Sequence, residues 1–355
     1  MARALALAEQ GLYTTTPNPR VGCVLVRDGV VIGEGFHERA GGPHAEVRAI
    51  ADARARGHDM RGVTAYVTLE PCNHIGRTAA CTEALVATGV ARVVAAMEDP
   101  NPNAAHGRER LRGAGITVDV GLMEREATAL NCGFVKRMVH GRPWVRLKAA
   151  SSLDGRTALA DGESKWITGA EARRDGHRWR ARACAIVTGI GTVRHDDPWF
   201  TVRDVATSRQ PRRVVLDRHA ETPPAAHVFE GEGALVVTAG GRNPLWPSQV
   251  EVVALPDADG RIDLVALMHE LARREINEVH LEAGAGLNGA FLAGRLVDEI
   301  VLYLAPCFLG DPARGIAAFA GGLSRLADRI ALEISTIEPV GADWRVTARV
   351  AGAAH

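Results

Sequence analysis

The chain has 355 residues, of which 46% are hydrophobic and 24% are charged, so it is long enough for two domains with ordinary globular cores. Lys and Arg together number 42, as do Asp and Glu, and this balance argues against nucleic acid or an anionic membrane as a partner. No apolar run is long enough to span a bilayer, residues 1–9 lack the features of a signal peptide, and six cysteines fit a reducing compartment. We therefore expect a cytoplasmic protein without a nucleic-acid or membrane partner.

The first part of the chain alternates predicted strands and helices. A hairpin turn at Asp28-Gly29 joins two buried strands, residues 21–26 and 30–33. The later elements are a helix over 45–56, a strand at 64–69, a helix that opens at Cys81, strands at 90–97 and 115–121, and a helix over 124–139. This order predicts a three-layer α/β sandwich with its site at the ends of strands and helices.

Four residues in this part form the pattern of a zinc-dependent deaminase: His44 and Glu46 in Pro43-His44-Ala45-Glu46, then Cys72 and Cys81. One imidazole and two thiolates supply three protein ligands and leave the fourth position open for water. Zinc lowers the pKa of that water, and Glu46, which is not a ligand, is placed to move its proton to the substrate. The pattern predicts hydrolytic deamination, with Glu46 as the catalytic residue.

A structural zinc site is the alternative. Such a site closes its tetrahedron with a fourth Cys or His, often in close pairs, and this chain has no close pair of cysteines. Cys72 and Cys81 are nine positions apart, and the polar segment 73–80 between them is expected to form a loop that contacts substrate. The other cysteines are expected to be small buried apolar residues; they are Cys23, Cys132, Cys184 and Cys307.

A domain boundary is predicted at His140-Gly141-Arg142-Pro143, because Gly and Pro end the preceding helix before a new strand begins. The domains are therefore residues 1–141 and 142–355. The second domain has predicted strands at 144–149, 185–187, 213–216, 234–237, 250–253 and 278–281, with helices over 170–182 and 264–274. Two last strands, 300–304 and 344–349, are expected to add an antiparallel pair at the edge of the sheet.

Two glycine-bearing turns follow strands in the second domain. Gly284-Ala285-Gly286-Leu287-Asn288-Gly289 matches G-x-G-x-x-G, and Thr188-Gly189-Ile190-Gly191-Thr192 is a shorter turn. Backbone amides at such turns bind phosphate oxygens, but the acidic residue of a dinucleotide fingerprint is missing at its usual spacing. The turns indicate cofactor contact outside an ordinary Rossmann domain, or plain tight turns. Nearby cations either anchor a phosphate or are solvated; they are Arg180, Arg182, Arg194 and Arg203.

Several motifs together resemble one family, the bifunctional riboflavin-biosynthesis deaminase–reductases, over nearly the whole chain. In the first domain they are Thr16-Pro17-Asn18-Pro19-Arg20-Val21-Gly22, Pro43-His44-Ala45-Glu46, Thr68-Leu69-Glu70-Pro71-Cys72-Asn73-His74, Gly76-Arg77-Thr78, Cys81 and Asp99-Pro100-Asn101-Pro102. In the second they are Ser152-Leu153-Asp154-Gly155-Arg156-Thr157, Trp166-Ile167-Thr168, Asp196-Asp197-Pro198 and Glu282-Ala283-Gly284. The wide spacing of the two cysteines is usual in this family.

The resemblance implies an N-terminal deaminase of cytidine-deaminase-like three-layer α/β/α fold and a C-terminal reductase of dihydrofolate-reductase-like α/β fold. The first would deaminate 2,5-diamino-6-(5-phosphoribosylamino)pyrimidin-4(3H)-one with one zinc ion. The second would use NADPH to reduce the ribosyl group of 5-amino-6-(5-phosphoribosylamino)uracil to ribityl. The resemblance also implies small-molecule partners and a homo-oligomer, a dimer or larger.

By matching position, the resemblance makes His44, Cys72 and Cys81 the zinc ligands and Glu46 the proton donor and acceptor, with Asn18 and His74 in the deaminase pocket. NADPH would be held by Ala150, Trp166, Thr192, Asp196, Arg218, Gly284, Ala285, Gly286, Leu287, Asn288, Gly289 and Ala290. The reductase substrate would contact Lys148, Ser164, Arg180, Phe200, Arg203 and Glu282.

Arg218 departs from the family, in which a Ser is familiar, and its guanidinium is predicted to favour the 2′-phosphate of NADP. Two rival interpretations are a nucleoside or tRNA deaminase with a non-reductase C-terminal domain, and a non-catalytic zinc-stabilised binding protein. The missing close pair of cysteines argues against a tRNA deaminase. Glu46 argues against the second, because a structural zinc has no use for a carboxylate beside an open position.

Overall fold

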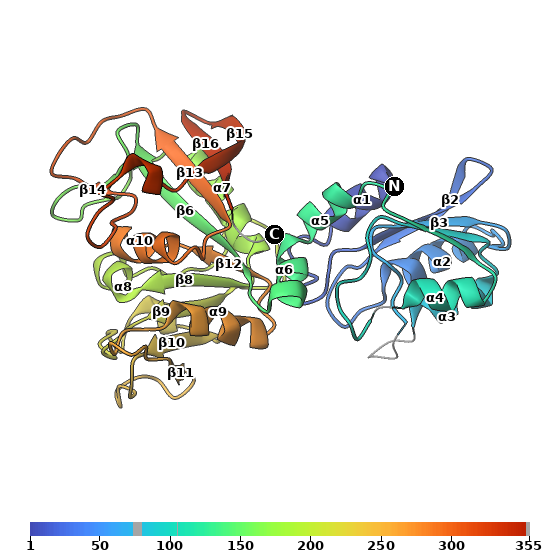
Figure 1. Ribbon diagram of the computed structural model, residues 1–355, viewed down its shortest axis with the longest axis horizontal. Helices are drawn as coiled ribbons and strands as arrows, with labels where there is room; N and C mark the ends of the chain where they lie inside the picture. The colour runs from blue at the N-terminus through green and yellow to red at the C-terminus, as the bar shows by residue number, and fades with distance from the viewer. Residues whose placement is uncertain (74–79, 105, 353–355) are drawn as a thin grey trace. The chain divides into compact units, whose positions relative to one another are not determined.

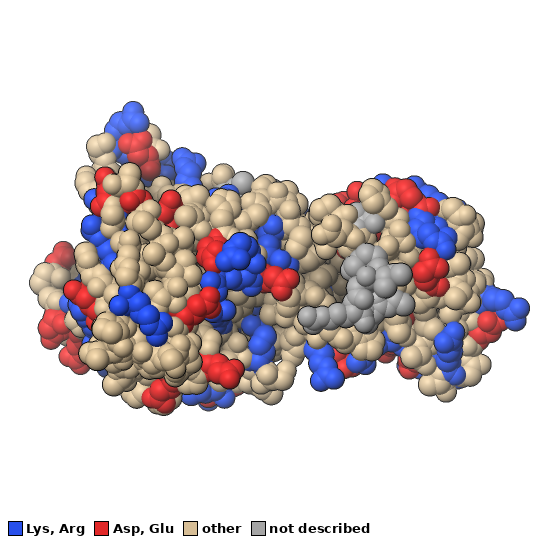
Figure 2. All heavy atoms as spheres, turned by 90° about the horizontal axis from the view of Figure 1, so that it is seen from below, with Lys and Arg blue, Asp and Glu red and all other residues tan. Residues whose placement is uncertain are grey.

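The computed structural model describes residues 1–73, 80–104 and 106–352, and the chain forms two compact units, Met1–Gly141 and Arg142–His355 (Figure 1). Each unit has its own sheet and its own apolar core. Basic and acidic side chains are interspersed over the face drawn in Figure 2. Among the described residues, no helix combines the length and the apolar character that crossing a membrane requires.

Unit 1 is built on a five-stranded sheet in the order β2-β1-β3-β4-β5. Its strands are β1 (Gly22–Arg27), β2 (Val30–Phe36), β3 (Thr64–Val67), β4 (Arg92–Ala95) and β5 (Thr117–Val120). The predicted hairpin is confirmed, because Arg27 of β1 pairs with Val30 of the antiparallel β2. Asp28 and Gly29 have φ values of 49° and 79°, as the turn type favoured in two-residue hairpins requires. The strands β3, β4 and β5 run parallel.

Helices cover both faces of this sheet. They are α1 (Ala2–Glu9), α2 (Ala45–Ala55), α3 (Cys81–Thr88), α4 (Gly107–Gly113), α5 (Glu124–Leu130) and α6 (Cys132–His140). Gly22 packs on α1, where an added Cβ would lie 2.0 Å from the carbonyl oxygen of Ala4. Gly35 packs on α2, where a Cβ would lie 2.6 Å from the Cβ of Arg48. Gly35 pairs with Cys23, the neighbour of Gly22, and successive residues of a strand face opposite ways. The two helices therefore lie on opposite faces, and the predicted three layers are confirmed.

The single helix predicted over 124–139 is wrong. Two helices, α5 and α6, meet at Asn131, which is buried. The side-chain oxygen of Asn131 accepts the backbone N–H of Arg20 at 2.8 Å, and its amide donates to the carbonyl of Arg20 at 2.9 Å. An Asn that bonds to a distant backbone in this way competes with regular helix. At this break, the Asn131 side chain holds the backbone of Arg20, just before β1, in place.

Unit 2 is built on a nine-stranded sheet in the order β11-β10-β9-β8-β12-β6-β13-β16-β15. Its strands are β6 (Trp144–Ser152), β8 (Ala185–Gly189), β9 (Arg212–Leu216), β10 (Ala234–Thr238), β11 (Glu251–Ala254), β12 (Glu278–Leu281), β13 (Glu299–Ala305), β15 (Leu332–Val340) and β16 (Asp343–Val350). Neighbours from β11 to β13 run parallel, and β16 is antiparallel to β13 and β15. A separate small sheet pairs β7 (Arg156–Ala158) with β14 (Arg314–Gly315).

The expected edge pair is only half right. The strands over 300–304 and 344–349 do pair antiparallel, but β13 also pairs with β6 and is therefore interior. The edge strand on this side of the sheet is β15, which the sequence analysis missed. The pairing of β15 with β16 is irregular between Ile334 and Thr336, and β15 contains Pro339. The alternation of polar and apolar residues that marks a regular strand in a sequence is therefore weak there.

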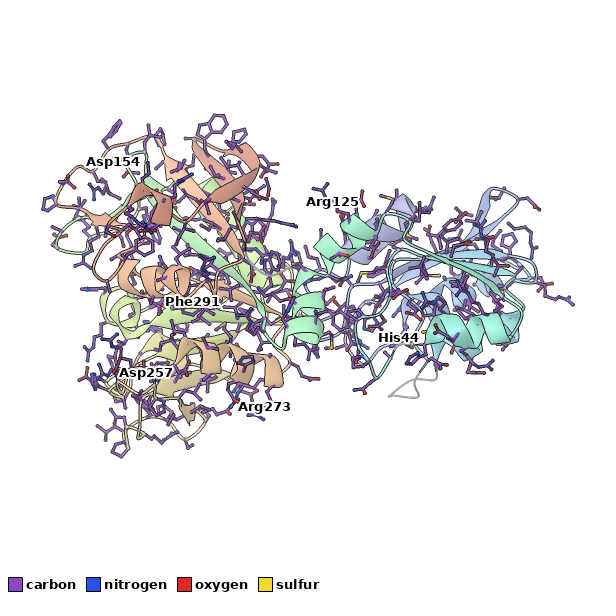
Figure 3. All side chains as sticks on the ribbon, in the orientation of Figure 1. His44, Arg125, Asp154, Asp257, Arg273 and Phe291 are labelled. Atoms are coloured by element: carbon purple, nitrogen blue, oxygen red, sulfur yellow. The ribbon has the colours of Figure 1, made fainter. Side chains whose placement is uncertain are left out.

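The two faces of the large sheet differ in chemistry. The helices of unit 2 are α7 (Ala170–Arg182), α8 (Ile190–Asp196), α9 (Leu264–Arg273) and α10 (Ala285–Ala293), with short 3₁₀ turns at His227–Phe229 and Leu326–Asp328. One face joins α9 and α10 in an apolar core that includes Val145, Leu147, Val279, Leu281 and Phe291, which Figure 3 labels on α10. On the other face Arg146 binds Glu278 at 3.1 Å, and Arg182 of α7 binds the same carboxylate at 2.7 Å. A charged layer therefore lies between α7 and the sheet.

Candidate active sites

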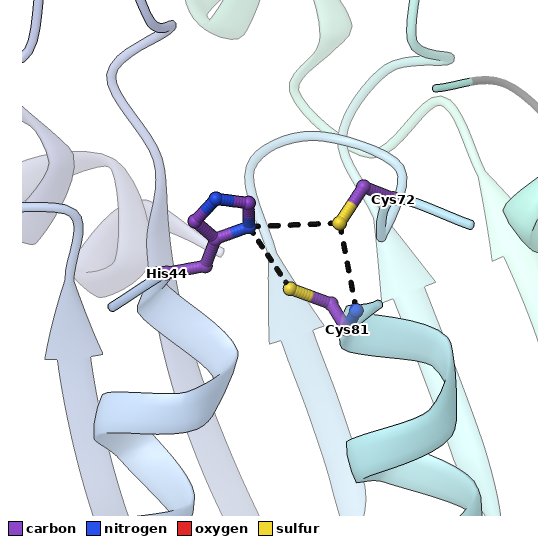
Figure 4. A group of neighbouring side chains, drawn as sticks. All are labelled: His44, Cys72 and Cys81. Atoms are coloured by element: carbon purple, nitrogen blue, oxygen red, sulfur yellow. Dashed lines mark hydrogen bonds between the residues drawn. The ribbon is translucent and has the colours of Figure 1, made fainter. Parts of the chain in front are cut away.

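Three elements of unit 1 bring His44, Cys72 and Cys81 together (Figure 4). His44 is the residue immediately before α2, Cys72 follows β3, and Cys81 is the first residue of α3. Nδ1 of His44 lies 3.2 Å from Sγ of Cys81 and 3.5 Å from Sγ of Cys72. All three ligand atoms lie within 4.8 Å of one another, so the structure gathers the predicted ligands around one point.

The spacing and chemistry of this cluster suit one zinc ion. Zinc bonds sulfur at about 2.3 Å and nitrogen at about 2.0 Å in a tetrahedron, which puts neighbouring ligand atoms roughly 3.5 to 3.8 Å apart. The distances of 3.2 and 3.5 Å from Nδ1 of His44 are close to this range. Within the described parts of the chain, no fourth Cys, His or carboxylate joins the cluster. The described residues therefore supply three ligands, as in catalytic rather than structural sites.

The surroundings of the two thiols have opposite effects on their charge: they favour the thiolate at Cys72 and the neutral thiol at Cys81. The backbone N–H of Cys81 donates to Sγ of Cys72 at 3.5 Å. A hydrogen bond from the Cys81 thiol, with a further contribution from His44, lowers the pKa of the Cys72 thiol. Cys81 is the first residue of α3, and the hydrogen bond that its thiol donates to Cys72, together with burial, raises its own pKa. The pair therefore holds one thiolate and one thiol, and a metal that binds both sulfur atoms would displace the proton of Cys81.

Glu46 lies in the first turn of α2 and is only 3% exposed. Burial raises the pKa of its carboxyl group, and the charge of Cys72 raises it further. The carboxyl also interacts with the Cys81 thiol, which places it directly beside the ligand cluster. A buried carboxyl at this point can hold or release a proton next to the open position of the metal.

The sequence analysis missed His37, which lies just after β2. Its ring meets that of His44 edge-on, with 5.3 Å between centroids. Nδ1 lies 3.1 Å from the carbonyl oxygen of Pro43, and Nε2 lies 3.1 Å from the amide nitrogen of Asn18. A carbonyl can only accept, so Nδ1 carries the proton and Nε2 accepts from the amide. His37 thus connects the predicted substrate residue Asn18 to the zinc cluster, and no sequence motif marks it.

A buried carboxylate, Glu70, supports the loop that carries Cys72. It accepts the backbone N–H groups of Asp99 at 3.2 Å and Arg108 at 2.8 Å. Burial raises the pKa of Asp99 to about 7. Glu70 and Asp99 both belong to motifs that carry the resemblance, yet the sequence alone gave neither a role. The predicted substrate residue His74 lies outside the described residues.

In unit 2, α7 and the end of β12 bring Arg180 and Glu282 together. The guanidinium binds the carboxylate through two bonds, Nε to Oε1 at 2.5 Å and Nη2 to Oε2 at 2.8 Å. It also lies over the ring of Phe200, 5.5 Å from the centroid, and donates to the carbonyl of Thr201 at 3.4 Å. Because a carboxylate already neutralises Arg180, this residue is a weaker phosphate anchor than the sequence suggested.

Arg203 and Lys148 are the other cations of this cluster. Arg203 is exposed, donates to Oγ1 of Thr201 at 3.2 Å, and has no ion pair with any acidic residue that the structure describes. Lys148 lies on β6, where burial lowers the pKa of its ammonium group and the charge of Glu282 opposes that shift. The remaining predicted substrate residue, Ser164, is half-buried in the loop between β7 and α7.

The glycine motif after β12 lies largely within α10 instead of forming an extended turn. Gly284 precedes the helix and Ala285 is its first residue. A Cβ added to Gly284 or Gly286 would meet no atom within 4 Å, so open space adjoins the first turn. At Gly289 a Cβ would lie 1.9 Å from the carbonyl oxygen of Ala318. The first-turn N–H groups can therefore receive a phosphate, whereas Gly289 allows close packing of the helix.

The other predicted cofactor residues come from several elements of unit 2. The Asn288 amide donates to the carbonyls of Ala283 and Ile316 at 3.1 and 2.9 Å, which is a structural role. The Trp166 ring is 69% exposed, and the guanidinium of Arg173 stacks on it at 4.5 Å. Remaining members are Ala150 and Leu287, both half-buried, Ala290 in α10, and Thr192 and Asp196 of α8. Lys165 donates to the carbonyl of Asp196 at 3.1 Å, which connects the Trp166 loop to α8.

Asp217 and Arg218 follow β9 and point in different directions. Asp217 is buried, and its Oδ2 accepts the N–H of Thr222 at 2.6 Å and the hydroxyl of Thr222 at 2.7 Å. Arg218 is exposed, and its Nη2 contacts the backbone carbonyl of Asp259 at 3.3 Å. The carboxylate is therefore occupied inside the protein, while the guanidinium remains available to a ligand.

Comparison with known proteins follows the same division of the chain. The family described as the cytidine and deoxycytidylate deaminase zinc-binding region matches residues 1–97, and the RibD C-terminal domain matches residues 143–346. The riboflavin biosynthesis protein RibD of Escherichia coli (strain K12) is 48% identical over 97% of this chain and 96% of its own length. The chain belongs to the RibD family.

Solved RibD structures agree with this assignment. RibD of Acinetobacter baumannii (form 1) is 43% identical, covers 98% of this chain and 97% of its own, and superposes with a TM-score of 0.90. The Thermotoga maritima protein, described as a diaminohydroxyphosphoribosylaminopyrimidine deaminase and 5-amino-6-(5-phosphoribosylamino)uracil reductase, is 37% identical over 99% and 97% of the two chains, with a TM-score of 0.89. The expected family and both α/β folds are confirmed.

Proposed function

We propose that the chain is a bifunctional enzyme of riboflavin biosynthesis. Residues 1–141 deaminate 2,5-diamino-6-(5-phosphoribosylamino)pyrimidin-4(3H)-one, and residues 142–355 reduce the ribosyl group of 5-amino-6-(5-phosphoribosylamino)uracil to ribityl. The observation that carries the proposal is the convergence of His44, Cys72 and Cys81 beside buried Glu46 in a chain that matches RibD proteins from end to end. The Thermotoga relative is named for these two reactions.

In the deaminase unit, His44, Cys72 and Cys81 would hold one zinc ion. When bound, the metal activates a water molecule as the nucleophile of a hydrolytic deamination. Glu46 would take one proton from the attacking water and pass it to the ring nitrogen. It would then carry the second proton, from the hydroxyl group that the attack leaves on the ring carbon, to the amine, which departs as ammonia. Asn18, held by His37, would contact the pyrimidine, and the same role is proposed for His74.

The rival functions fit the molecule less well. A structural zinc would be closed by a fourth ligand, and the described residues provide three. A tRNA deaminase with an unrelated C-terminal domain does not account for residues 143–346, which match the RibD C-terminal domain. Small-molecule substrates therefore remain the proposal for both units.

In the reductase unit, the cofactor NADPH supplies the hydride, which no side chain can provide. The first turn of α10 offers its free N–H groups and the open space beside Gly284 and Gly286 to the phosphates of NADPH. Trp166, Ala150, Thr192 and Asp196 would hold the rest of the cofactor near β6 and α8.

Arg218 would read the 2′-phosphate that distinguishes NADPH from NADH. Arg218 follows β9, which is next to β8 and its glycine-bearing turn and one strand removed from β12, and Arg suits a phosphate. An NAD-specific site would present a carboxylate to the ribose hydroxyls. Asp217 is instead turned inward onto Thr222.

The reductase substrate would lie over the cluster of Arg180 and Glu282. Exposed Arg203 would bind the 5′-phosphate, since it has no carboxylate partner among the described residues. Glu282, fixed by Arg180, and Lys148, with its lowered pKa, would face the ribose hydroxyls, with Phe200 and Ser164 completing the wall.

We also infer that the protein is a cytoplasmic homo-oligomer that associates through β15. This edge strand exposes apolar side chains, with Leu332, Ile334 and Ile337 at 45%, 61% and 55%. Exposed apolar edge strands pair readily with a second chain. All six cysteines are free, which suits the cytoplasm. Light scattering should give a dimer or larger for the wild type and a smaller species for Ile334→Lys, and a monomeric wild type would refute the inference.

Glu46→Gln tests the division of labour between the two units. The variant keeps the shape of the side chain but cannot accept the proton, so ammonia release should fall about 10²- to 10⁴-fold. NADPH oxidation with the aminouracil should stay at the wild-type rate. Ammonia release at the wild-type rate would contradict the role of Glu46, and a wild-type protein that never oxidises NADPH would contradict the reductase.

A further inference from the structure

The segment that carries Arg203, residues 200–204, is held by hydrogen bonds to the backbone of three successive residues, Thr201, Val202 and Arg203. Arg180 of α7 donates to the carbonyl of Thr201 at 3.4 Å. The Gln210 side chain accepts the N–H of Val202 at 2.7 Å and donates to its carbonyl at 3.2 Å. The third bond involves the backbone of Arg203 itself.

The partner of that backbone is a buried histidine, His177, which is 7% exposed on α7. Its Nδ1 accepts the N–H of Arg203 at 3.4 Å. A backbone N–H can only donate, so Nδ1 is unprotonated and the neutral ring carries its proton on Nε2. That nitrogen lies 3.6 Å from Oδ2 of Asp204, the next residue. One ring thus contacts two consecutive residues of the segment.

The helix and the segment are positioned by a common set of contacts. His177 and Arg180 are three positions apart on α7, so their side chains lie on the same side of the helix. Phe200, at the start of the segment, has a φ of 48°, a left-handed conformation that side chains disfavour. Contacts from α7 hold the segment in a shape that it would not adopt alone.

We propose that neutral His177 is a positioning residue of the reductase, which fixes the backbone of Arg203 so that its guanidinium meets the 5′-phosphate of the substrate. His177 does not touch the substrate and acts only through Arg203. The inference rests on the proposed reductase function of this unit.

The surroundings of His177 keep its ring neutral. Burial lowers its pKa, and the charges of Arg180 on the same helix and of Arg203 lower it further. Asp204 from the segment and Glu282 from the end of β12 oppose the shift. The neutral ring is therefore present above this lowered pKa. Below it, Nδ1 carries a proton and can no longer accept the N–H of Arg203, so the contact is lost as the pH falls.

His177→Asn and His177→Leu form a matched pair. The Oδ1 of Asn can take the place of Nδ1 and does not titrate, whereas Leu has a similar size and no acceptor. In the His177→Leu variant, the KM for the aminouracil should rise about three- to tenfold, which is the factor expected for the loss of one neutral hydrogen bond. Its kcat should stay near that of the wild type. Asn should keep the wild-type KM at neutral pH. The loss of NADPH absorbance measures the reductase reaction of both variants.

The pH dependence separates positioning from a merely structural role. As the pH falls, the KM of the wild type should rise relative to that of His177→Asn. The phosphate of the substrate titrates with a second pKa of about 6, but it affects both proteins equally. His280, with Nε2 at 3.4 Å from Glu282, is also common to both.

Three results would overturn the positioning role. The first is a folded His177→Leu variant with the KM of the wild type, and the second is a His177→Asn variant whose KM is as high as that of His177→Leu. The third is a ratio of the wild-type KM to the His177→Asn KM that does not change with pH. If the Leu variant fails to fold, the comparison of wild type with Asn across pH decides alone. A wild type that never oxidises NADPH with the aminouracil would refute the proposed reductase instead.

Discussion

The two candidate sites of this molecule are built in different ways. In unit 1, three side chains from the ends of secondary-structure elements place their ligand atoms within 4.8 Å of one another. In unit 2, the candidate residues are spread over β6, the ends of β9 and β12, the loop before α7, the helices α7, α8 and α10, and the segment around Arg203. A metal demands particular residue types at fixed distances, whereas a cofactor and a sugar phosphate can be held by many combinations of donors.

This difference predicts how each site fails. The metal cluster should fail completely when one ligand is lost, because each ligand is required. The distributed site should fail in parts, with separate residues governing the substrate phosphate and the cofactor phosphate. Three substitutions test this contrast.

Cys72→Ser should have the largest effect. A serine hydroxyl is a poor zinc ligand, so bound zinc should be lost and ammonia release should fall by more than about 10³-fold. NADPH oxidation with the aminouracil should be unchanged. Metal analysis and the two assays measure this, with Cys307→Ser in unit 2 as the matched control. Full zinc content in Cys72→Ser would show that the cluster is not the metal site.

Arg203→Ala should have an intermediate effect that is confined to the substrate. Loss of a charge-assisted bond to phosphate should raise the KM for the aminouracil about 10- to 100-fold and leave NADPH binding unchanged. Arg194→Ala is the control, because Arg194 is exposed and already pairs with Glu221 at 2.8 Å. An equal effect of both substitutions would mean that Arg203 contributes only general positive charge.

Arg218→Ser should have the smallest effect, confined to the cofactor. The Kd for NADPH should rise about tenfold, while the Kd for NADH, which lacks the 2′-phosphate, should stay the same. Titration of cofactor fluorescence without substrate measures both constants. A similar loss for both cofactors, or for neither, would remove Arg218 from the reading of the 2′-phosphate.

The sequence predicted most of unit 1 because its signals are local. The Asp28-Gly29 hairpin and the ligands at the ends of elements are each visible within a few residues. It missed His37, whose role depends on contacts with Asn18 and Pro43 from different segments. It also missed the break at Asn131, which is set by a contact with Arg20 that lies 111 positions away.

Unit 2 was harder to predict for the same reason. The sequence marked Arg180 as a cation but could not show that Glu282, 102 positions later, neutralises it. It marked the glycine motif but not that Gly289 serves helix packing against Ala318. The α7 helix was predicted with its observed bounds, yet the contact of His177 with Arg203 exists only in the folded chain.

The most direct test of the account is complementation between two variants, Glu46→Gln and Glu282→Gln. The first should reduce but not deaminate, and the second should deaminate but not reduce. Each alone should fail to convert the diaminopyrimidinone to the ribityl product, and an equimolar mixture should restore the conversion. A mixture that stays inactive, although each variant performs its own half-reaction, would contradict two independent active sites in one chain.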